Sequence, residues 1–296
     1  MAAREGESVR GVLPLTKVSS RLFGKRMVSQ AFSNYGGPLA DNASAVDELL
    51  NSAFEIALEH GCSSVELRNI EALPYDLVSQ EDKVCMVLPL ARDPDKLWRG
   101  FRPEIRNRVR KAEKSGLVAA SGGQELLRDF YLLWTIRMRQ LGTPCYPESL
   151  FRNILETFPE HARIFIVRRG RITAGAAFDY SFNGFAQCRW AATRVELNQA
   201  APNTLLYWSA IRHYCLAGDR VFDFGRSTVG SGQYEFKRRW GAQPVQLNYQ
   251  YWVRPDKKFR PVRPDNPRYS RLVKTWTKLP LGITRFLGPH ISKSLA

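Results

Sequence analysis

The sequence has no long apolar run and no apolar leader. No stretch approaches the roughly eighteen consecutive apolar residues that a membrane-spanning helix requires. The first residues, MAAREGESVRGVLPL, are polar and lack the apolar segment of a secretory signal peptide. We therefore expect a cytoplasmic protein.

Cysteine and histidine are too few and too scattered to build a cross-linked or metal-bound scaffold. The chain has five cysteines and four histidines, with no C-x-x-C pair and no metal-ligand spacing. An odd, dispersed set of thiols argues against a disulfide framework and for reduced, buried side chains. His213 and Cys215 lie two apart on a predicted helix, so they point to different faces and do not form a nucleophile–base pair. We expect no metal site and no cysteine nucleophile.

Acidic residues are outnumbered, with 28 Asp and Glu against 44 Lys and Arg, which gives a net charge of +16. From Arg254 to Ala296 there are eleven Lys or Arg and two Asp, so this segment alone carries +9. More than half of the excess positive charge lies on this short tail. The net charge therefore does not require that the whole surface be positive, as it is in many nucleic-acid-binding proteins. Non-catalytic binding of nucleic acid, such as tRNA, through a basic helix and this tail is the alternative to an enzymatic function.

The tail also contains apolar residues interleaved with its cations between Pro267 and Ala296. Such a segment can lie as an amphipathic helix on the inner membrane or on a membrane-bound partner. It can equally pack onto the preceding domain. Pro280 and Gly282 interrupt any single long helix, and the sequence leaves both alternatives open.

The stretch 220–242, RVFDFGRSTVGSGQYEFKRRWGA, has the pattern of a strand, a glycine turn and a helix. Residues 221–224 form a short apolar run, Gly225 ends it, and Gly230–Gly232 precede a helical pattern that stops at Gly241. Backbone N–H groups and cations at such a strand end suit an anionic or carbonyl-bearing ligand. The spacing is neither that of a phosphate-binding P-loop nor that of a dinucleotide fingerprint.

The order of predicted elements indicates an α+β protein without internal repeats. Turns at Arg169-Gly170 and Asn183-Gly184 separate three successive strands between 162 and 194. We expect a first domain at 1–93, a second at 94–254 with the order αα-βββ-α-β-α-β, and a basic amphipathic tail at 255–296. Amphipathic periodicity predicts helices at 45–59, 99–114, 124–141, 147–158, 201–217 and 234–240.

Residues 222–244, FDFGRSTVGSGQYEFKRRWGAQP, resemble the FDFG…G-x-FK-x-x-[FW]-G segment of FemAB-like transferases, including those that accompany exosortase/PEP-CTERM systems. The resemblance implies tandem GNAT-like (acyl-CoA N-acyltransferase-like) domains, the first apparently incomplete at its N-terminus. It also implies an acyl- or aminoacyltransferase that acts on a cell-envelope or exopolysaccharide precursor.

Three other segments match the same family. Tyr35 lies in a loop, FSNYGG, that resembles the family's tyrosine–glycine loop at the acceptor cleft; the alternative is a plain turn. The basic helical segment with Arg106, Asn107 and Arg110 resembles the R-N-x-[VI]-R-[KR]-A-x-K-x-G helix that borders this cleft, although a solvated basic face is the simpler interpretation. Tyr146 lies in a GTP-x-YP turn that two prolines stiffen, which suits a cleft wall or a simple helix–helix turn.

The expected donor site departs from that of ordinary acetyltransferases. There is no glycine between Gly184 and Gly218, where a GNAT domain usually carries its pyrophosphate-binding turn. We therefore expect weak or no binding of acetyl-CoA and no tightly bound cofactor. The acyl donor stays open between aminoacyl-tRNA and an acyl thioester.

Acyl transfer requires a held acceptor, removal of its proton and stabilisation of the carbonyl oxygen. The resemblance makes Lys237 of the FK motif a catalytic candidate, and Asp223 is a candidate base, although an Asp between buried strand residues more often orients a neighbouring loop. No residue stands out as an obligatory nucleophile, which fits direct transfer. Further substrate-binding candidates are Asn203, Tyr207, Arg226, Ser227 and Phe236. With Tyr35 and Arg106, Lys237 is expected to surround the transfer site.

Overall fold

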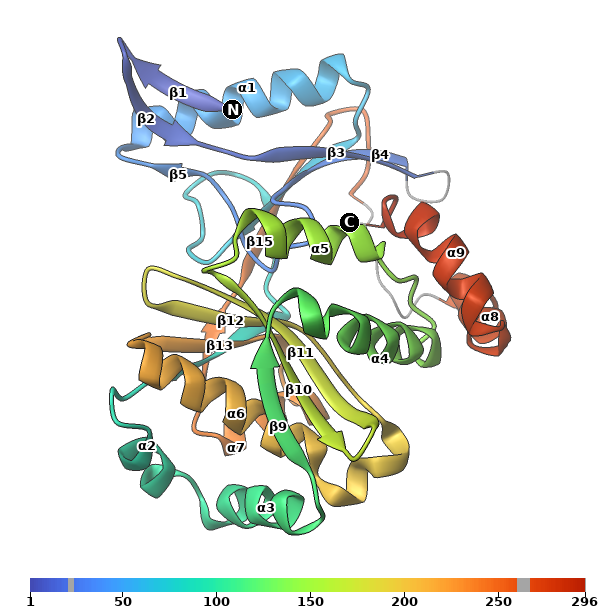
Figure 1. Ribbon diagram of the computed structural model, residues 1–296. Coiled ribbons are helices and arrows are strands. Elements are labelled where there is room, and N and C mark those ends of the chain that lie inside the picture. The colour runs from blue at the N-terminus through green and yellow to red at the C-terminus, as the bar shows by residue number, and fades with distance from the viewer. Residues whose placement is uncertain (21–23, 260–266, 296) are drawn as a thin grey trace. The chain divides into compact units, whose positions relative to one another are not determined.

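The computed structural model describes residues 1–20, 24–259 and 267–295, and its contacts divide the chain into two units. Unit 1 comprises residues 1–85, 245–266 and 290–296, and unit 2 comprises residues 86–244 and 267–289. Neither unit is continuous in sequence. Figure 1 labels the elements along the chain.

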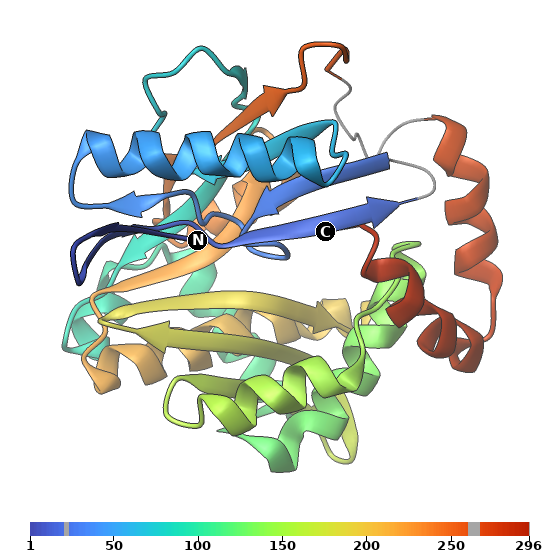
Figure 2. The ribbon, with the colours of Figure 1, turned by 90° about the horizontal axis from the view of Figure 1, so that it is seen from above.

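The described residues of unit 1 form two sheets. A five-stranded sheet has the order β3-β4-β6-β15-β7, and a three-stranded sheet has the order β1-β2-β5. Helix α1 contacts β1, β2, β5 and β6 and runs along one face of the strands (Figure 2). The bounds are β1 (Ala2–Glu5), β2 (Ser8–Val12), β3 (Leu15–Ser20), β4 (Gly24–Ser29), β5 (Leu39–Ala40), α1 (Ala43–Glu59), β6 (Ser64–Asn69), β7 (Val78–Gln80) and β15 (Asn248–Val253).

Helix α1 begins where the sequence supplies a cap. The side chain of Asn42 accepts a hydrogen bond from the backbone N–H of Ala45 at 2.9 Å, which satisfies one of the free donors at a helix start. The helix buries Leu49, Leu50 and Ala53 against the strands, so the amphipathic pattern of the sequence predicted it correctly.

Strand β15 falls within the expected range 94–254 but belongs to unit 1. β15 pairs antiparallel with β6 from Asn248↔Asn69 to Val253↔Ser64, and with β7, so it is an interior strand of unit 1. Conversely β8 (Lys83–Pro89), which lies within the expected first domain at 1–93, is found between β13 and β14 in a seven-stranded sheet. Strand pairing depends on contacts distant in sequence, which local periodicity does not report.

Unit 2 is organised on a seven-stranded sheet of order β14-β8-β13-β12-β11-β10-β9. Helix α4 contacts β10, β11 and β12, and α6 contacts β9 to β12 (Figure 1). The bounds are α2 (Pro94–Gly100), α3 (Pro103–Lys114), β9 (Val118–Gly122), α4 (Leu127–Gln140), α5 (Glu148–Thr157), β10 (Ala162–Arg169), β11 (Ile172–Phe182), β12 (Phe185–Thr193), α6 (Pro202–Ala217), β13 (Val221–Thr228), α7 (Gly232–Arg239) and β14 (Gln243–Gln246), with 3-10 turns at Gln124–Leu126 and Val195–Ala200.

Aromatic side chains fill unit 2. Phe130, Phe151 and Phe178 are fully buried in one cluster with α4 and α5. Among these three rings the centroid separations are 5.1 to 5.5 Å. A second set, which includes Phe222 and Trp240, joins β13 to α6 and α7. Burial of such rings removes large apolar surfaces from water and stabilises this unit.

Two local features of unit 2 differ from the prediction. Strand β9 was not expected; it pairs with β10 at the sheet edge. The basic segment 99–114 is not one helix, because α2 ends at Gly100 and Pro103 begins α3. Proline has no N–H to donate and favours the first turn of a new helix.

The tail 267–295 forms α8 (Pro267–Lys278) and α9 (Leu281–Ser292), separated near Pro280 as the sequence indicated. The part of the tail in unit 2 packs beside α4 (Figure 1). Arg139 Nη1 donates to the carbonyl of Leu279 at 3.0 Å, and Trp276 is only 9 % exposed. Packing onto the second domain, one of the two expected alternatives, is therefore confirmed for this part of the tail. None of the helices in the described ranges is long and apolar enough to cross a bilayer.

Candidate active site

Strands β12 and β13 run parallel and pair only at their first residues. Their register joins Phe185 to Val221 and ends at Gln187 and Asp223, although β12 continues to Thr193 and β13 to Thr228. Beyond this point the two strands no longer pair. The backbone N–H and C=O groups at their carboxyl ends therefore do not hydrogen-bond to each other. Such a point of strand separation is suited to an extended ligand that completes the hydrogen bonding.

A β-bulge lies beside this point. Phe178 pairs with Trp190 and Asp179 pairs with Cys188, so Arg189 is an additional residue on β12. The Arg189 guanidinium lies 5.2 Å from the centroid of the Trp190 ring. Bulges bend a strand and redirect its side chains, and they are common next to active sites.

Asp223 is fully buried at the last ladder pair, and both of its oxygens accept hydrogen bonds. Gln187 Nε2 donates to Oδ2, and the backbone N–H of Gly225 donates to Oδ1 at 2.7 Å. Tyr180 Oη in turn donates to Gln187 Oε1. Gly225 has φ +78°, which a glycine tolerates best. These contacts match the alternative in which Asp223 orients the adjacent turn; its role as a base stays a prediction.

Lys237 is a buried cation that contacts the end of β13. It lies on α7, which Ser231 caps by accepting from the N–H of Tyr234 at 3.2 Å. Its side chain is 7 % exposed, and Nζ donates to the carbonyls of Gly225 and Arg226 at 2.9 and 3.0 Å. A buried ammonium is stable only when its N–H groups donate hydrogen bonds. Lys237 therefore fixes the turn after the strand and brings positive charge to it.

The remaining candidates of this segment surround the same strand end. Arg226 is exposed, whereas Ser227 is 3 % exposed and its Oγ has no hydrogen-bond partner among the described residues. Tyr207 of α6 packs on Phe224 and Phe236, with centroid distances of 5.1 and 5.6 Å. The structure thus gathers Tyr207, Asp223, Arg226, Ser227, Phe236 and Lys237 around β13 and α7.

A buried acidic and thiol pair lies on β11 and β12. Asp179 is fully buried, and neither carboxylate oxygen has a hydrogen-bond partner in the described part of the chain by distance and angle. Burial raises its pKa from the ordinary 3.8 to about 8, and the nearby Cys188 thiol opposes this shift. Burial likewise raises the pKa of Cys188 and of Tyr207 well above their usual ranges. Asp179 is therefore mostly neutral at pH 7.

Arg106, Asn107 and Arg110 lie on α3 and not at the strand end. Helix α3 buries Ile105 and Val109 and contacts α6, so its basic face is turned outward. Arg106 Nη1 donates to the carbonyl of Arg99 at 2.7 Å. Arg110 lies 5.8 Å from the Trp98 ring and 3.3 Å from Asn107 Oδ1. Their role in acceptor binding stays a prediction.

Tyr146 and Asn203 occupy two different places in unit 2. Tyr146 packs on Trp134 and Trp190, with centroid distances of 5.5 and 6.3 Å, and its carbonyl accepts from Tyr131 Oη at 2.9 Å. These contacts give it a packing role at the edge of the aromatic cluster. Asn203 is half-buried in the first turn of α6.

The turn before α6 has no glycine cradle. The 3-10 turn Val195–Ala200 leads into Ala201, with φ 56°, and then into Pro202 at the first helical position. Proline has no N–H, so this helix start offers one donor fewer to an anion than a glycine turn does. The expected weak binding of acetyl-CoA stays a prediction.

Tyr35 belongs to unit 1, in a tightly braced loop. Arg68 Nη1 donates to the carbonyl of Ser33 at 2.7 Å, and the N–H of Gly36 donates to the carbonyl of Arg68 at 2.8 Å. A Cβ on Gly36 would lie 2.2 Å from Gln30 Cβ, so only glycine fits there. Gln30 itself has φ 48°, an unusual conformation for a non-glycine residue. Strain and bracing of this kind are typical of functional loops.

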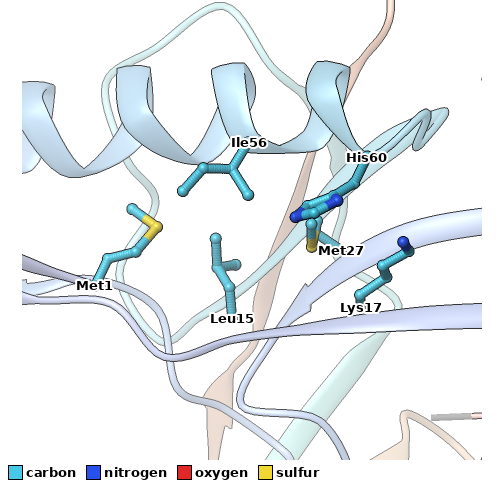
Figure 3. Close-up of a pocket in the computed structure, with 6 residues that line it drawn as sticks. All are labelled: Met1, Leu15, Lys17, Met27, Ile56 and His60. Carbon is cyan, nitrogen blue, oxygen red and sulfur yellow. The ribbon is translucent and has the colours of Figure 1, made fainter.

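Unit 1 also has an open pocket of about 260 Å³ between α1 and the strands β3 and β4 (Figure 3). Apolar side chains line most of it, and Lys17 and His60 supply its polar groups. None of the site residues expected from the sequence lines this pocket. In the described ranges, no group of three or more metal-ligating side chains occurs, and the five cysteines are buried and form no disulfide there.

The sequence analysis missed Tyr180, Gln187, Asp179 and the bulge at Arg189. Asp179 had a visible signal, since a carboxylate stands inside the apolar run AGAAFDY. Gln187 had none, because a glutamine on a strand usually faces solvent. Only the register of β12 and β13 shows that it meets Asp223.

Comparison with known proteins agrees with this geometry. Residues 99–238 match the family model described as an acetyltransferase (GNAT) domain. The fold of the chain is GNAT-like α+β. No curated protein sequence matches this chain.

Three solved structures illustrate the fold. FemX has a TM-score of 0.62 at 17 % identity, covering 83 % of this chain and 86 % of its own. The C-terminal domain of a protein described as a lysylphosphatidylglycerol synthetase of Agrobacterium fabrum has a TM-score of 0.59 at 11 % identity, covering 83 % and 82 %. A tandem GNAT protein from the clavulanic acid pathway has a TM-score of 0.50 at 14 % identity, covering 88 % and 83 %. At these identities the likeness concerns the fold alone.

Proposed function

We propose that this protein transfers an acyl or aminoacyl group directly to an amine or hydroxyl of a cell-envelope or exopolysaccharide precursor. The observation that carries the proposal is the end of the β12–β13 ladder at Gln187 and Asp223, with the buried cation Lys237 beside it. One end of the donor would lie where the two strands part. FemAB-like character and an association with exosortase systems belong to this proposal as well.

In the proposed reaction the acceptor nitrogen or oxygen attacks the acyl carbonyl, and a new C–N or C–O bond forms. The bond from the acyl carbon to the leaving oxygen or sulfur breaks, the acceptor loses a proton and the leaving group gains one. Negative charge develops on the carbonyl oxygen. The N–H groups of the turn 227–232 and the charge of Lys237 would stabilise it, and no covalent enzyme intermediate is required.

The donor that fits best is an aminoacyl-tRNA. Proline at the start of α6 and the missing glycine turn disfavour an acyl-CoA pyrophosphate. The exposed basic face of α3, with Arg110, Lys111 and Lys114, would contact the RNA backbone. The name of the solved structure described as a lysylphosphatidylglycerol synthetase refers to a lipid that carries lysine. A lipid acceptor of that kind is consistent with an envelope acceptor here.

The test is transfer by the full chain from each class of donor. Mass spectrometry of envelope glycans, lipids and peptides from cells with and without the protein would identify the acceptor. The purified protein would then be supplied with that acceptor and either labelled aminoacyl-tRNAs or acyl thioesters. Transfer from neither donor would contradict the proposal.

Non-catalytic binding of nucleic acid is the competing function, and the basic face of α3 is the observation that favours it. Part of that face is neutralised, because Glu104 Oε1 lies 3.7 Å from Arg108 and 2.9 Å from Arg239. A salt series with charged tRNA, uncharged tRNA and unrelated RNA separates the two. Equal, steeply salt-dependent binding of all three, without transfer, favours the competing function.

A further inference from the structure

The part of helix α9 in unit 2, residues 281–289, packs through its small and polar residues. Thr284 is 3 % exposed, and its carbonyl lies 3.5 Å from Cys145 Sγ. A Cβ on Gly288 would lie 2.7 Å from the same sulfur, so the two backbones touch there. Arg285 lies 3.7 Å from Glu148 and 5.1 Å from the Tyr131 ring. The helix is therefore held in a fixed orientation.

The opposite side of α9 is apolar and exposed. Phe286 is 71 % exposed, Ile283 43 % and Leu287 38 %. Positions 283, 286 and 287 share one helical face, whereas 284 and 288 share another. A helix on a water-soluble surface normally has the reverse arrangement, with its large apolar side chains facing the core. A contiguous exposed apolar stripe marks an interaction surface.

The charge around this stripe favours one kind of occupant. From Pro267 to Ala296 the sequence has six Lys or Arg and no Asp or Glu. Of these, Arg271, Lys274, Lys278 and Lys293 are exposed. Leu272 on α8 is also 58 % exposed, so apolar and cationic side chains alternate there. Inserted apolar side chains flanked by cations are the features with which a helix binds the surface of an anionic bilayer.

We propose that α8 and α9 dock the protein on an anionic phospholipid surface, with Phe286, Ile283 and Leu287 entering the headgroup region. The basic side chains of α8 contact the phosphate groups. This docking rests on the exposed stripe and its charge, and it does not depend on the proposed transfer reaction.

Point substitutions test the docking better than deletion of the tail, because deletion would uncover α4. Full-length protein would be floated with vesicles of neutral lipid alone or with about one-third phosphatidylglycerol, at about 0.15 M salt. The test variant is Phe286→Asp. Its matched control is Phe182→Asp, because Phe182 is also 71 % exposed and lies on β11 of the same unit.

The expected result is flotation of the natural protein and the Phe182→Asp variant with anionic vesicles only, while Phe286→Asp stays in solution. The pair Lys274→Glu and Lys278→Glu should weaken binding by at least about fivefold per charge, a change that the exposed control pair Arg169→Glu and Arg171→Glu does not produce. Thermal unfolding would verify that all variants are folded.

Three outcomes would overturn the proposal. The natural protein fails to float, Phe286→Asp floats as well as the natural protein, or binding is the same with neutral vesicles. If the natural protein does not float but forms a dimer that the Phe286→Asp variant loses, the stripe binds a second copy of this chain and not a membrane.

Discussion

The buried carboxyl of Asp179 leads to a quantitative prediction about stability and pH. In the folded protein burial raises its pKa to about 8, from 3.8 when it is hydrated. Between these values the folded state binds more protons at this site than the unfolded state does. The free energy of unfolding therefore falls as pH rises from about 4 to 8, and the contribution of Asp179 levels off above 8.

The substitution Asp179→Asn removes this titration while keeping the shape of the side chain. One pKa unit corresponds to about 1.4 kcal/mol, so the natural protein should lose roughly 3 kcal/mol relative to the variant between about pH 5 and pH 7.5. The assay is urea unfolding of both proteins at a series of pH values. The difference between them isolates this one group, since the other titrating groups are common to both.

A difference in unfolding free energy that does not change across this range would refute the argument. It would mean that Asp179 is hydrated or paired in solution. The absolute offset between the proteins is not diagnostic, because a buried amide also lacks partners at this position. Only the slope with pH tests the burial.

Three further predictions concern single positions. Lys237→Ala should raise the barrier to transfer by about 2–4 kcal/mol, measured as activity per folded molecule, and should also lower the unfolding free energy because two carbonyl contacts are lost; turnover at the natural rate would remove Lys237 from the site. Calorimetry should detect weak or no binding of acetyl-CoA. Micromolar binding would instead indicate an ordinary acetyl-CoA-dependent acetyltransferase. Gly36→Ala should destabilise unit 1 by about 1–3 kcal/mol, since the new Cβ would meet Gln30 Cβ at 2.2 Å; an unchanged melting temperature would show that the loop relaxes.

The sequence predicted features that depend on neighbouring residues. The apolar face of α1, the hairpin turn at Asn183-Gly184 and the break at Pro280 are all local patterns, and the structure has them. The stretch 220–242 was predicted as strand, glycine turn and helix, which β13 and α7 confirm. Local propensity and hydrophobic period suffice for elements of this kind.

The site and the strand partners could be predicted only in part, because they depend on distant contacts. Lys237 was expected as a cleft cation, but that its ammonium is buried against two carbonyls follows from the packing of α7 on β13. The partner of Asp223 is Gln187, which is 36 residues away in sequence. The orientation of α9 was likewise hidden, since its pattern does not reveal which of its two faces is buried.

The place of β15 between β6 and β7 has a consequence for synthesis of the chain. Gln250 accepts a hydrogen bond from Asn69, 181 residues earlier in the sequence. The five-stranded sheet of unit 1 therefore cannot be completed until nearly all of unit 2 has left the ribosome. Until then β6 and β7 lack their common neighbour and expose unpaired edges, which are prone to aggregate. All seven strands of the sheet in unit 2 precede β15 in the sequence, so this sheet can form before the five-stranded sheet of unit 1 is complete. Helix α8, which also belongs to unit 2, is synthesised after β15.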